Sequence, residues 1–121
     1  MKRIRVLLID DEEELVSALA ERLMLRDIEA VGVTRGAEGL RWLEKEQFDV
    51  IILDLKMPDM SGMEVMRRVG KLAPEVPVIL FTGHGSVKSS EEGLEQGAFA
   101  YLAKPIRIEE LVATIKEAAA G

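Results

Sequence analysis

The chain has 121 residues, of which 48% are hydrophobic and 31% charged, and its net charge is −6 at pH 7. This composition predicts one globular domain over residues 1–121, and the acidic balance argues against direct nucleic-acid binding. No apolar stretch is long enough to cross a membrane, and the short apolar run near the N-terminus does not resemble a signal peptide. The chain contains no cysteine, which excludes thiolate metal sites and fits the cytoplasmic location that we expect.

Five short runs rich in apolar residues predict the strands of a sheet. They are Ile4–Ile9, Glu29–Val33, Val50–Leu53, Val76–Phe81 and Ala98–Ala103. The first, third and fourth runs are apolar throughout, which is typical of strands buried on both faces of a parallel sheet. The second run is shorter and more polar, which suits an edge strand.

Apolar residues spaced three and four apart predict amphipathic helices between these runs. The repeats are Val16, Leu19 and Leu23, then Val65, Met66, Val69 and Leu72, and finally Ile108, Leu111, Val112 and Ile115. The sequence from Ser61 to Glu64 matches a capping box, whereas Arg107 is a poor N-cap for the last helix. A helix over roughly 86–96 contains serines and a glycine, so we expect it to be only marginally stable.

The alternation of strands and helices predicts an α/β fold with a doubly wound parallel sheet. In such sheets, ligand sites form at the carboxyl ends of the strands. Polar residues stand at these ends: Asp10 and Asp11 after the first run, and Asp54, Thr82 and Lys104 after the third, fourth and fifth. Each alone could be a helix cap, a turn residue, a strand end or a surface lysine. Their conjunction at one predicted edge indicates a site.

The residue types indicate the chemistry of this site. Three clustered carboxylates repel one another, and a cation bound among them lowers the free energy. Oxygen ligands suit a hard ion such as Mg²⁺, for which Mn²⁺ can substitute. A carboxylate beside such an ion can act as a nucleophile on phosphorus, and a lysine can neutralise the phosphoryl oxygens. The residues therefore predict a metal seat at Asp10 and Asp11, with Asp54 as phosphoryl acceptor.

The motifs together resemble the receiver domain of response regulators in two-component signalling. They are the double acid Asp10-Asp11, the stretch LDLKMPDMSG from Leu53 to Gly62, the TG pair at Thr82 and the KP pair at Lys104. The resemblance covers the whole length of the chain. It implies five βα units, (βα)5, in the flavodoxin-like strand order 2-1-3-4-5.

The resemblance also implies a role for each acidic residue. Asp54 would accept the phosphoryl group, and Asp11 would bind the metal directly. Asp10 would act mainly through metal-bound water, and the backbone carbonyl of Lys56 would complete the protein ligands.

Three further residues take roles from the same resemblance. Thr82 would bond a phosphoryl oxygen, and Lys104 would pair with the phosphoryl group. Tyr101 matches the aromatic position that moves when Thr82 is drawn inward. The peptide bond before Pro105 is expected to be cis.

The expected function is that of a phosphorylation-dependent switch. A sensor histidine kinase or phosphotransfer protein would donate the phosphoryl group. The surface of the fourth helix, fifth strand and fifth helix would then control an effector domain or partner protein, in transcriptional regulation, and could form a phosphorylation-dependent homodimer. The domain would catalyse only its own phosphorylation and dephosphorylation. Lys56 and His84, two residues past Asp54 and Thr82, are the candidates for tuning dephosphorylation.

Four other classes fit less well. A haloacid-dehalogenase-like phosphatase would have a second aspartate two residues after the nucleophile, where this chain has Lys56. Dinucleotide-binding enzymes and FMN carriers need a glycine-rich or hydroxyl-rich loop in place of Asp10-Asp11-Glu12. An interaction scaffold that had lost phosphorylation would lack Asp54, Thr82 or Lys104.

Overall fold

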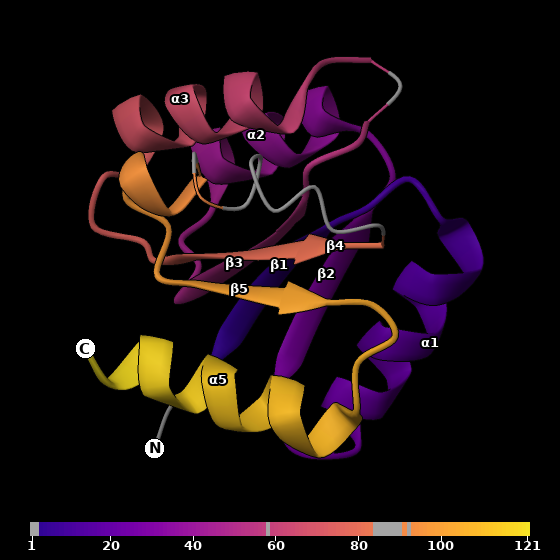
Figure 1. Cartoon of the computed structure of the whole chain (residues 1–121). Coiled ribbons are helices and arrows are strands. Elements are labelled where there is room, and N and C mark those ends of the chain that lie inside the picture. Colours follow the sequence, from indigo (N-terminus) through magenta and orange to yellow (C-terminus); the bar gives the residue numbers. More distant parts are fainter. Residues whose placement is uncertain (1–2, 58, 84–90, 92) are drawn as a thin grey trace.

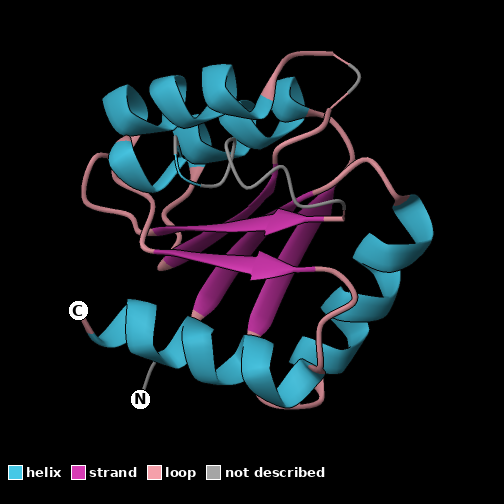
Figure 2. Ribbon diagram, in the orientation of Figure 1, coloured by secondary structure: helices cyan, strands magenta, loops and turns pink. Residues whose placement is uncertain are grey.

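The computed structural model describes residues 3–57, 59–83, 91 and 93–121. Its strands form one parallel sheet in the order β2-β1-β3-β4-β5 (Figure 1), which confirms the predicted fold class. The strands are β1 (Arg5–Ile9), β2 (Glu29–Val33), β3 (Val50–Asp54), β4 (Val78–Thr82) and β5 (Ala100–Ala103). Helices cover both faces of the sheet, with α1 and α5 on one face and α2 and α3 on the other (Figure 2). Their bounds are α1 (Glu13–Met24), α2 (Gly36–Lys45), α3 (Gly62–Leu72) and α5 (Ile108–Ala120).

The sheet interior is apolar on both faces, as its sequence predicted. All residues of β3 and β4 are buried, as are those of β1 after Arg5. Side chains from alternate positions enter two clusters, one under α1 and α5 and the other under α2 and α3. Strand β2 lies at an edge and is only partly buried, again as predicted. No helix in the described part of the chain is long and apolar enough to cross a membrane.

Gly32 in β2 allows helix α1 to approach the sheet closely. A Cβ atom at this position would lie 2.2 Å from Cγ1 of Val16, far inside van der Waals contact. A larger residue would therefore push α1 away from the strand.

The strands begin and end at positions slightly different from those predicted. Strand β4 begins at Val78 rather than Val76, because Pro77 has no N–H to donate to the sheet. Strand β5 begins at Ala100 rather than Ala98, and the N–H of Ala98 donates to the carbonyl of Gly93 instead. Both β3 and β4 extend by one residue, so Asp54 and Thr82 belong to the strands themselves.

Helices α3 and α5 differ at their N-termini in side-chain capping, as the sequence predicted. Ser61 is the N-cap of α3, and its Oγ accepts a hydrogen bond of 3.1 Å from the N–H of Glu64. The Glu64 carboxylate does not accept the second bond of a capping box, from the N–H of Ser61, but pairs with Arg67 and Arg68. Arg107 is the N-cap of α5 and makes no side-chain capping bond. Most of the helix predicted over 86–96 lies outside the described residues.

Candidate functional site

Strand ends bring the predicted polar residues to one edge of the sheet. Asp10 directly follows β1, Asp54 and Thr82 are the last residues of β3 and β4, and Lys104 directly follows β5. Asp10, Thr82 and Asp54 are all buried, with at most 4% of their surface exposed, whereas Asp11 is exposed. Burial of charged groups at the end of an apolar sheet requires compensation by other charges or hydrogen bonds.

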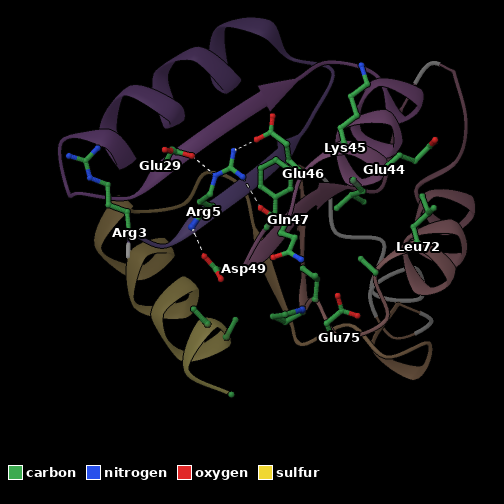
Figure 3. Close-up of a pocket in the computed structure, with 18 residues that line it drawn as sticks. Arg3, Arg5, Glu29, Glu44, Lys45, Glu46, Gln47, Asp49, Leu72 and Glu75 are labelled. Carbon is green, nitrogen blue, oxygen red and sulfur yellow. Dashed lines mark hydrogen bonds and ion pairs between the residues drawn. The ribbon is translucent and has the colours of Figure 1, made fainter. Parts of the chain in front are cut away.

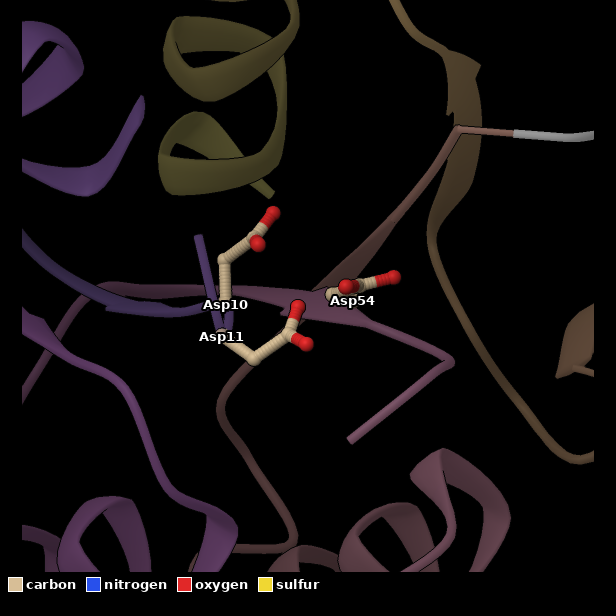
Figure 4. Close-up of side chains that lie close together, drawn as sticks. All are labelled: Asp10, Asp11 and Asp54. Carbon is tan, nitrogen blue, oxygen red and sulfur yellow. The ribbon is translucent and has the colours of Figure 1, made fainter. Parts of the chain in front are cut away.

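Asp10, Asp11 and Asp54 form a cluster of carboxylates (Figure 4). One oxygen from each lies within 4.8 Å of the others, a spacing at which one ion can contact all three. Asp10 Oδ1 accepts from the N–H of Glu12 at 3.0 Å, and Asp54 Oδ1 accepts from the N–H of Lys56 at 3.2 Å. The N-cap of α1 is Glu12 and not Asp10, so helix capping does not explain the double aspartate. An all-oxygen set of this kind suits a small divalent cation.

Lys104 supplies a positive charge inside this cluster. Its Nζ lies 2.6 Å from Asp10 Oδ2, 2.9 Å from Glu12 Oε1 and 3.7 Å from Asp54 Oδ2. The ammonium is also 5.1 Å from the centre of the Phe81 ring, a cation–π distance. Burial alone would lower the pKa of Lys104, but its hydrogen bonds to Asp10 and Glu12 outweigh burial and raise it. The lysine therefore stays charged. The peptide bond between Lys104 and Pro105 is cis.

Asp54 remains under-compensated despite this lysine. Burial raises the pKa of Asp54 to about 6, and the charges of Asp10 and Asp11 act in the same direction. The Lys56 N–H and the Lys104 ammonium act in the opposite direction without cancelling the rise. More positive charge at this edge would stabilise the ionised Asp54, which is what a bound cation supplies.

The remaining predicted residues surround this cluster. The side chain of Lys56 is at the exposed start of the β3–α3 loop. The carbonyl of Thr82 accepts a hydrogen bond of 2.8 Å from the N–H of Lys104, which ties the ends of β4 and β5 together. Tyr101 lies in β5 beside Leu80 and packs, half-buried, against the cluster of apolar residues under α2 and α3. His84 lies outside the described residues.

Two residues at this edge have contacts that the sequence did not indicate. Glu12, the N-cap residue of α1, contacts Lys104 from 92 residues away. Asp59, in the β3–α3 loop, accepts hydrogen bonds from the N–H groups of Gly36 and Ala37 and so caps α2. Burial would raise the pKa of Asp59, but these two bonds outweigh it and lower the pKa. Both contacts join distant parts of the chain, so no local pattern could have indicated them.

A wide hollow of about 930 Å³ lies at the opposite, amino-terminal end of the strands (Figure 3). Arg5 lines it, with its guanidinium paired to Glu29 and Glu46, hydrogen-bonded to the Gln47 carbonyl and 4.7 Å from the Phe48 ring centre. The guanidinium is therefore engaged in joining the start of β1 to the start of β2 and to the end of α2. The hollow at the carboxyl edge, beside Lys104, is smaller, at about 460 Å³. The clustered carboxylates and Lys104 nevertheless lie at that edge and not in the larger hollow.

Known proteins resemble this chain in both sequence and fold. The family profile described as "Response regulator receiver domain" matches residues 6–116. The transcriptional regulatory protein GlrR of Escherichia coli is 38% identical over 117 residues, which are 97% of this chain. The chain spans only 26% of the length of that relative.

Solved structures agree with this match. A CheY-like response regulator receiver domain protein from Methanospirillum hungatei superposes with a TM-score of 0.93 at 32% identity, covering 98% of this chain and 95% of the other. A response regulator from Burkholderia pseudomallei, solved with a phosphorylated aspartic acid, calcium ion and citrate, superposes with a TM-score of 0.88 at 28% identity. That match covers 97% of this chain and 69% of the other. Because the family profile matches most of its length and its fold matches solved receiver domains, the chain belongs to the response regulator receiver domain family.

Proposed function

We propose that this domain accepts a phosphoryl group on Asp54 from a sensor histidine kinase or phosphotransfer protein. The observation that carries this proposal is the convergence of Asp10, Asp11 and Asp54 at one sheet edge, with the Lys104 ammonium against Asp10 and Asp54. The phosphorylated aspartic acid and calcium ion of the similar Burkholderia protein support it. The raised pKa of Asp54 also supports it, because a bound cation would stabilise the ionised carboxylate.

The metal in this proposal is Mg²⁺, for which Mn²⁺ can substitute. Asp11 and Asp54 would bind it directly, Asp10 mainly through a water molecule, and the carbonyl of Lys56 would supply a further oxygen. When bound, the ion would neutralise charge on the phosphoryl oxygens. Asp10 already holds Lys104 at 2.6 Å, which fits a residue that orients its neighbours more than it binds the ion itself.

In the transfer step, an oxygen of the Asp54 carboxylate attacks phosphorus. A bond forms between this oxygen and phosphorus, while the bond from phosphorus to the donor nitrogen breaks and the leaving imidazole keeps the electron pair and takes up a proton. Lys104 pairs with a phosphoryl oxygen, and the Thr82 hydroxyl donates a hydrogen bond to another. The ionised form of Asp54 is the nucleophile. With a pKa of about 6, most of this carboxyl group is ionised at neutral pH.

The output follows from the position of Thr82 and Tyr101 on neighbouring strands. Movement of Thr82 toward the phosphoryl group would leave room for Tyr101 to rotate inward and would change the surface of residues 86–96, β5 and α5. This surface would control an effector domain or partner protein, or join two copies of the domain. The name of GlrR supports an effector in transcriptional regulation. The domain would work in the cytoplasm and catalyse no reaction other than its own phosphorylation and dephosphorylation.

Incubation with Mg²⁺ and a small phosphodonor, followed by intact-mass measurement, tests the proposal. The protein should gain one phosphoryl group, and Asp54→Asn should gain none. Asp49→Asn is the matched control, because Asp49 is an exposed carboxylate directly before the opposite end of the same strand. Equal phosphorylation of the Asp54→Asn variant and the parent would contradict the assignment.

A further inference from the structure

Glu12 holds Lys104 together with the site aspartates. The Lys104 ammonium is 2.9 Å from Glu12 Oε1 and 2.6 Å from Asp10 Oδ2, but 3.7 Å from Asp54 Oδ2. The side chain of Lys104 is 12% exposed and that of Glu12 is 61% exposed. The lysine is therefore largely fixed at the site, and Glu12 reaches it from the solvent side.

A phosphoryl group on Asp54 would require Lys104 to change partners. The ammonium would move away from the two carboxylates that it contacts most closely and toward the phosphoryl oxygens. Asp10 belongs to the carboxylate cluster suited to a metal ion, so its charge would be compensated there. Glu12 lies outside this cluster and would keep its full negative charge, so it remains the carboxylate that competes for the lysine.

We propose that Glu12 is a positioning residue that competes with the phosphoryl group for the Lys104 ammonium and thereby weakens the hold of the site on that group. The proposal rests on the proposed function, because it concerns the same phosphoryl site. A carboxylate at this position keeps Lys104 on the side of α1 in the resting state. Its loss would free the lysine for the phosphoryl oxygens.

The test measures the affinity for beryllofluoride, an analogue of the phosphoryl group, at saturating Mg²⁺. Glu12→Gln should bind it more tightly, by about two- to fivefold, the range typical of partly exposed ion pairs. Glu13→Gln is the matched control, since Glu13 is an exposed acid in the first turn of α1 and takes no part in the ion pairs of Lys104 in the described structure. It reports the effect of net charge alone.

Two further measurements separate competition for Lys104 from a general structural effect. In a Lys104→Met background, the gain from Glu12→Gln should fall to the value of the Glu13→Gln control. In protein labelled at lysine Cε, the NMR signal of Lys104 should shift in Glu12→Gln and stay in place in Glu13→Gln, with no beryllofluoride present.

The outcomes distinguish this proposal from the proposed function. Absence of beryllofluoride binding by the parent protein would count against the phosphoryl site itself. If the parent binds it but Glu12→Gln and Glu13→Gln bind with equal affinity, or Glu12→Gln binds more weakly, the role of Glu12 is wrong while the phosphoryl site stands. An unmoved Lys104 signal in Glu12→Gln would equally overturn it.

Discussion

Lys104 Nζ lies 2.6 Å from Asp10 Oδ2, within the group of carboxylates that would hold a metal ion. A lysine there partly satisfies the negative charge, so an incoming divalent cation competes with it. We predict that Lys104→Met raises the affinity for Mg²⁺ by roughly tenfold, from the loss of one nearby positive charge at a distance of a few ångströms. Isothermal calorimetry or NMR titration measures this affinity.

Lys71→Met is the control, because Lys71 is an exposed lysine in α3 and its loss changes net charge equally. It should leave Mg²⁺ affinity close to that of the parent.

Asp11→Ala should weaken Mg²⁺ binding strongly, since Asp11 is the exposed member of the cluster and the expected direct ligand. Binding by Asp11→Ala as tight as that of the parent would show that the metal site is wrongly assigned.

The raised pKa of Asp54 predicts how the stability of the metal-free protein depends on pH. Its pKa is about 6 in the folded protein, against an ordinary value of 3.8. Between these values the folded state binds the proton more tightly than the unfolded state does, so stability falls as pH rises through this window. At pH 7 the ionised Asp54 should cost on the order of 2–3 kcal/mol of unfolding free energy.

Asp54→Asn removes this charge and keeps the shape of the side chain. In urea denaturation with chelator present, the variant should be more stable than the parent at pH 7, and the difference should shrink as pH falls from 7 toward 4. The comparison of variant with parent cancels the titration of other groups. A difference that stayed constant over this pH range would show that the carboxyl is not destabilised by burial.

The sequence was sufficient to predict the sheet and the edge at which the candidate site lies. Apolar runs in β1, β3 and β4 are long enough that only a doubly covered sheet buries them, and parallel strands necessarily bring their carboxyl ends together. Asp10, Asp54 and Lys104 therefore converge because of their positions at the strand ends, independently of their side-chain conformations. The surroundings of Asp54 could be predicted because they depend on strand order and residue type.

Contacts between distant segments could not be predicted in the same way. Glu12 looks like any acidic residue at a helix start, yet it binds Lys104 because the ends of β1 and β5 face the same edge. Asp59 stands in a loop motif, but it caps α2 through Gly36 and Ala37, more than 20 residues earlier. Strand ends also shifted where Pro77 lacks an N–H and where Ala98 donates outside the sheet.

The capping hydroxyl of Ser61 predicts a measurable contribution to stability. Its Oγ satisfies the N–H of Glu64 at the start of α3, so Ser61→Ala should lower the unfolding free energy by about 1 kcal/mol. Ser61→Asp should keep most of this stability, because a carboxylate accepts the same bond and favours the helix N-terminus. Urea denaturation measures both variants. Equal stability of Ser61→Ala and the parent would show that the cap contributes nothing.

The switch predicts where the domain responds to a phosphoryl mimic. With beryllofluoride and Mg²⁺, amide hydrogen exchange should change most in residues 86–96, β5 and α5, because in the proposed switch Thr82 and Tyr101 would connect the site to this surface. The helix predicted over 86–96 has low intrinsic propensity and should be the most responsive part. Helices α1 and α2 serve as internal controls. Changes confined to those two helices would be incompatible with the proposed output surface.

The lifetime of the phosphorylated state depends on how water reaches the acyl phosphate. Hydrolysis needs a water molecule in line with the bond from phosphorus to Asp54. The N–H of Lys56 already bonds Asp54 Oδ1 at 3.2 Å, and its side chain starts from the exposed rim of the site. A charged lysine has no acceptor atom with which to orient or deprotonate water, and its length lets it cover the phosphoryl oxygens.

We therefore predict that Lys56→Asn shortens the lifetime of the phosphoprotein, since the amide uncovers the approach path and offers an oxygen to the attacking water. Decay of purified phosphoprotein at constant Mg²⁺ and pH measures the effect. Lys71→Asn, at an exposed position of α3, is the control for the change of charge and should decay like the parent. Because the backbone N–H of residue 56 is retained, the hydrogen bond to Asp54 survives in the variant, and any change in decay reports the side chain alone. Unchanged or slower decay of Lys56→Asn would mean that the lysine does not protect the acyl phosphate.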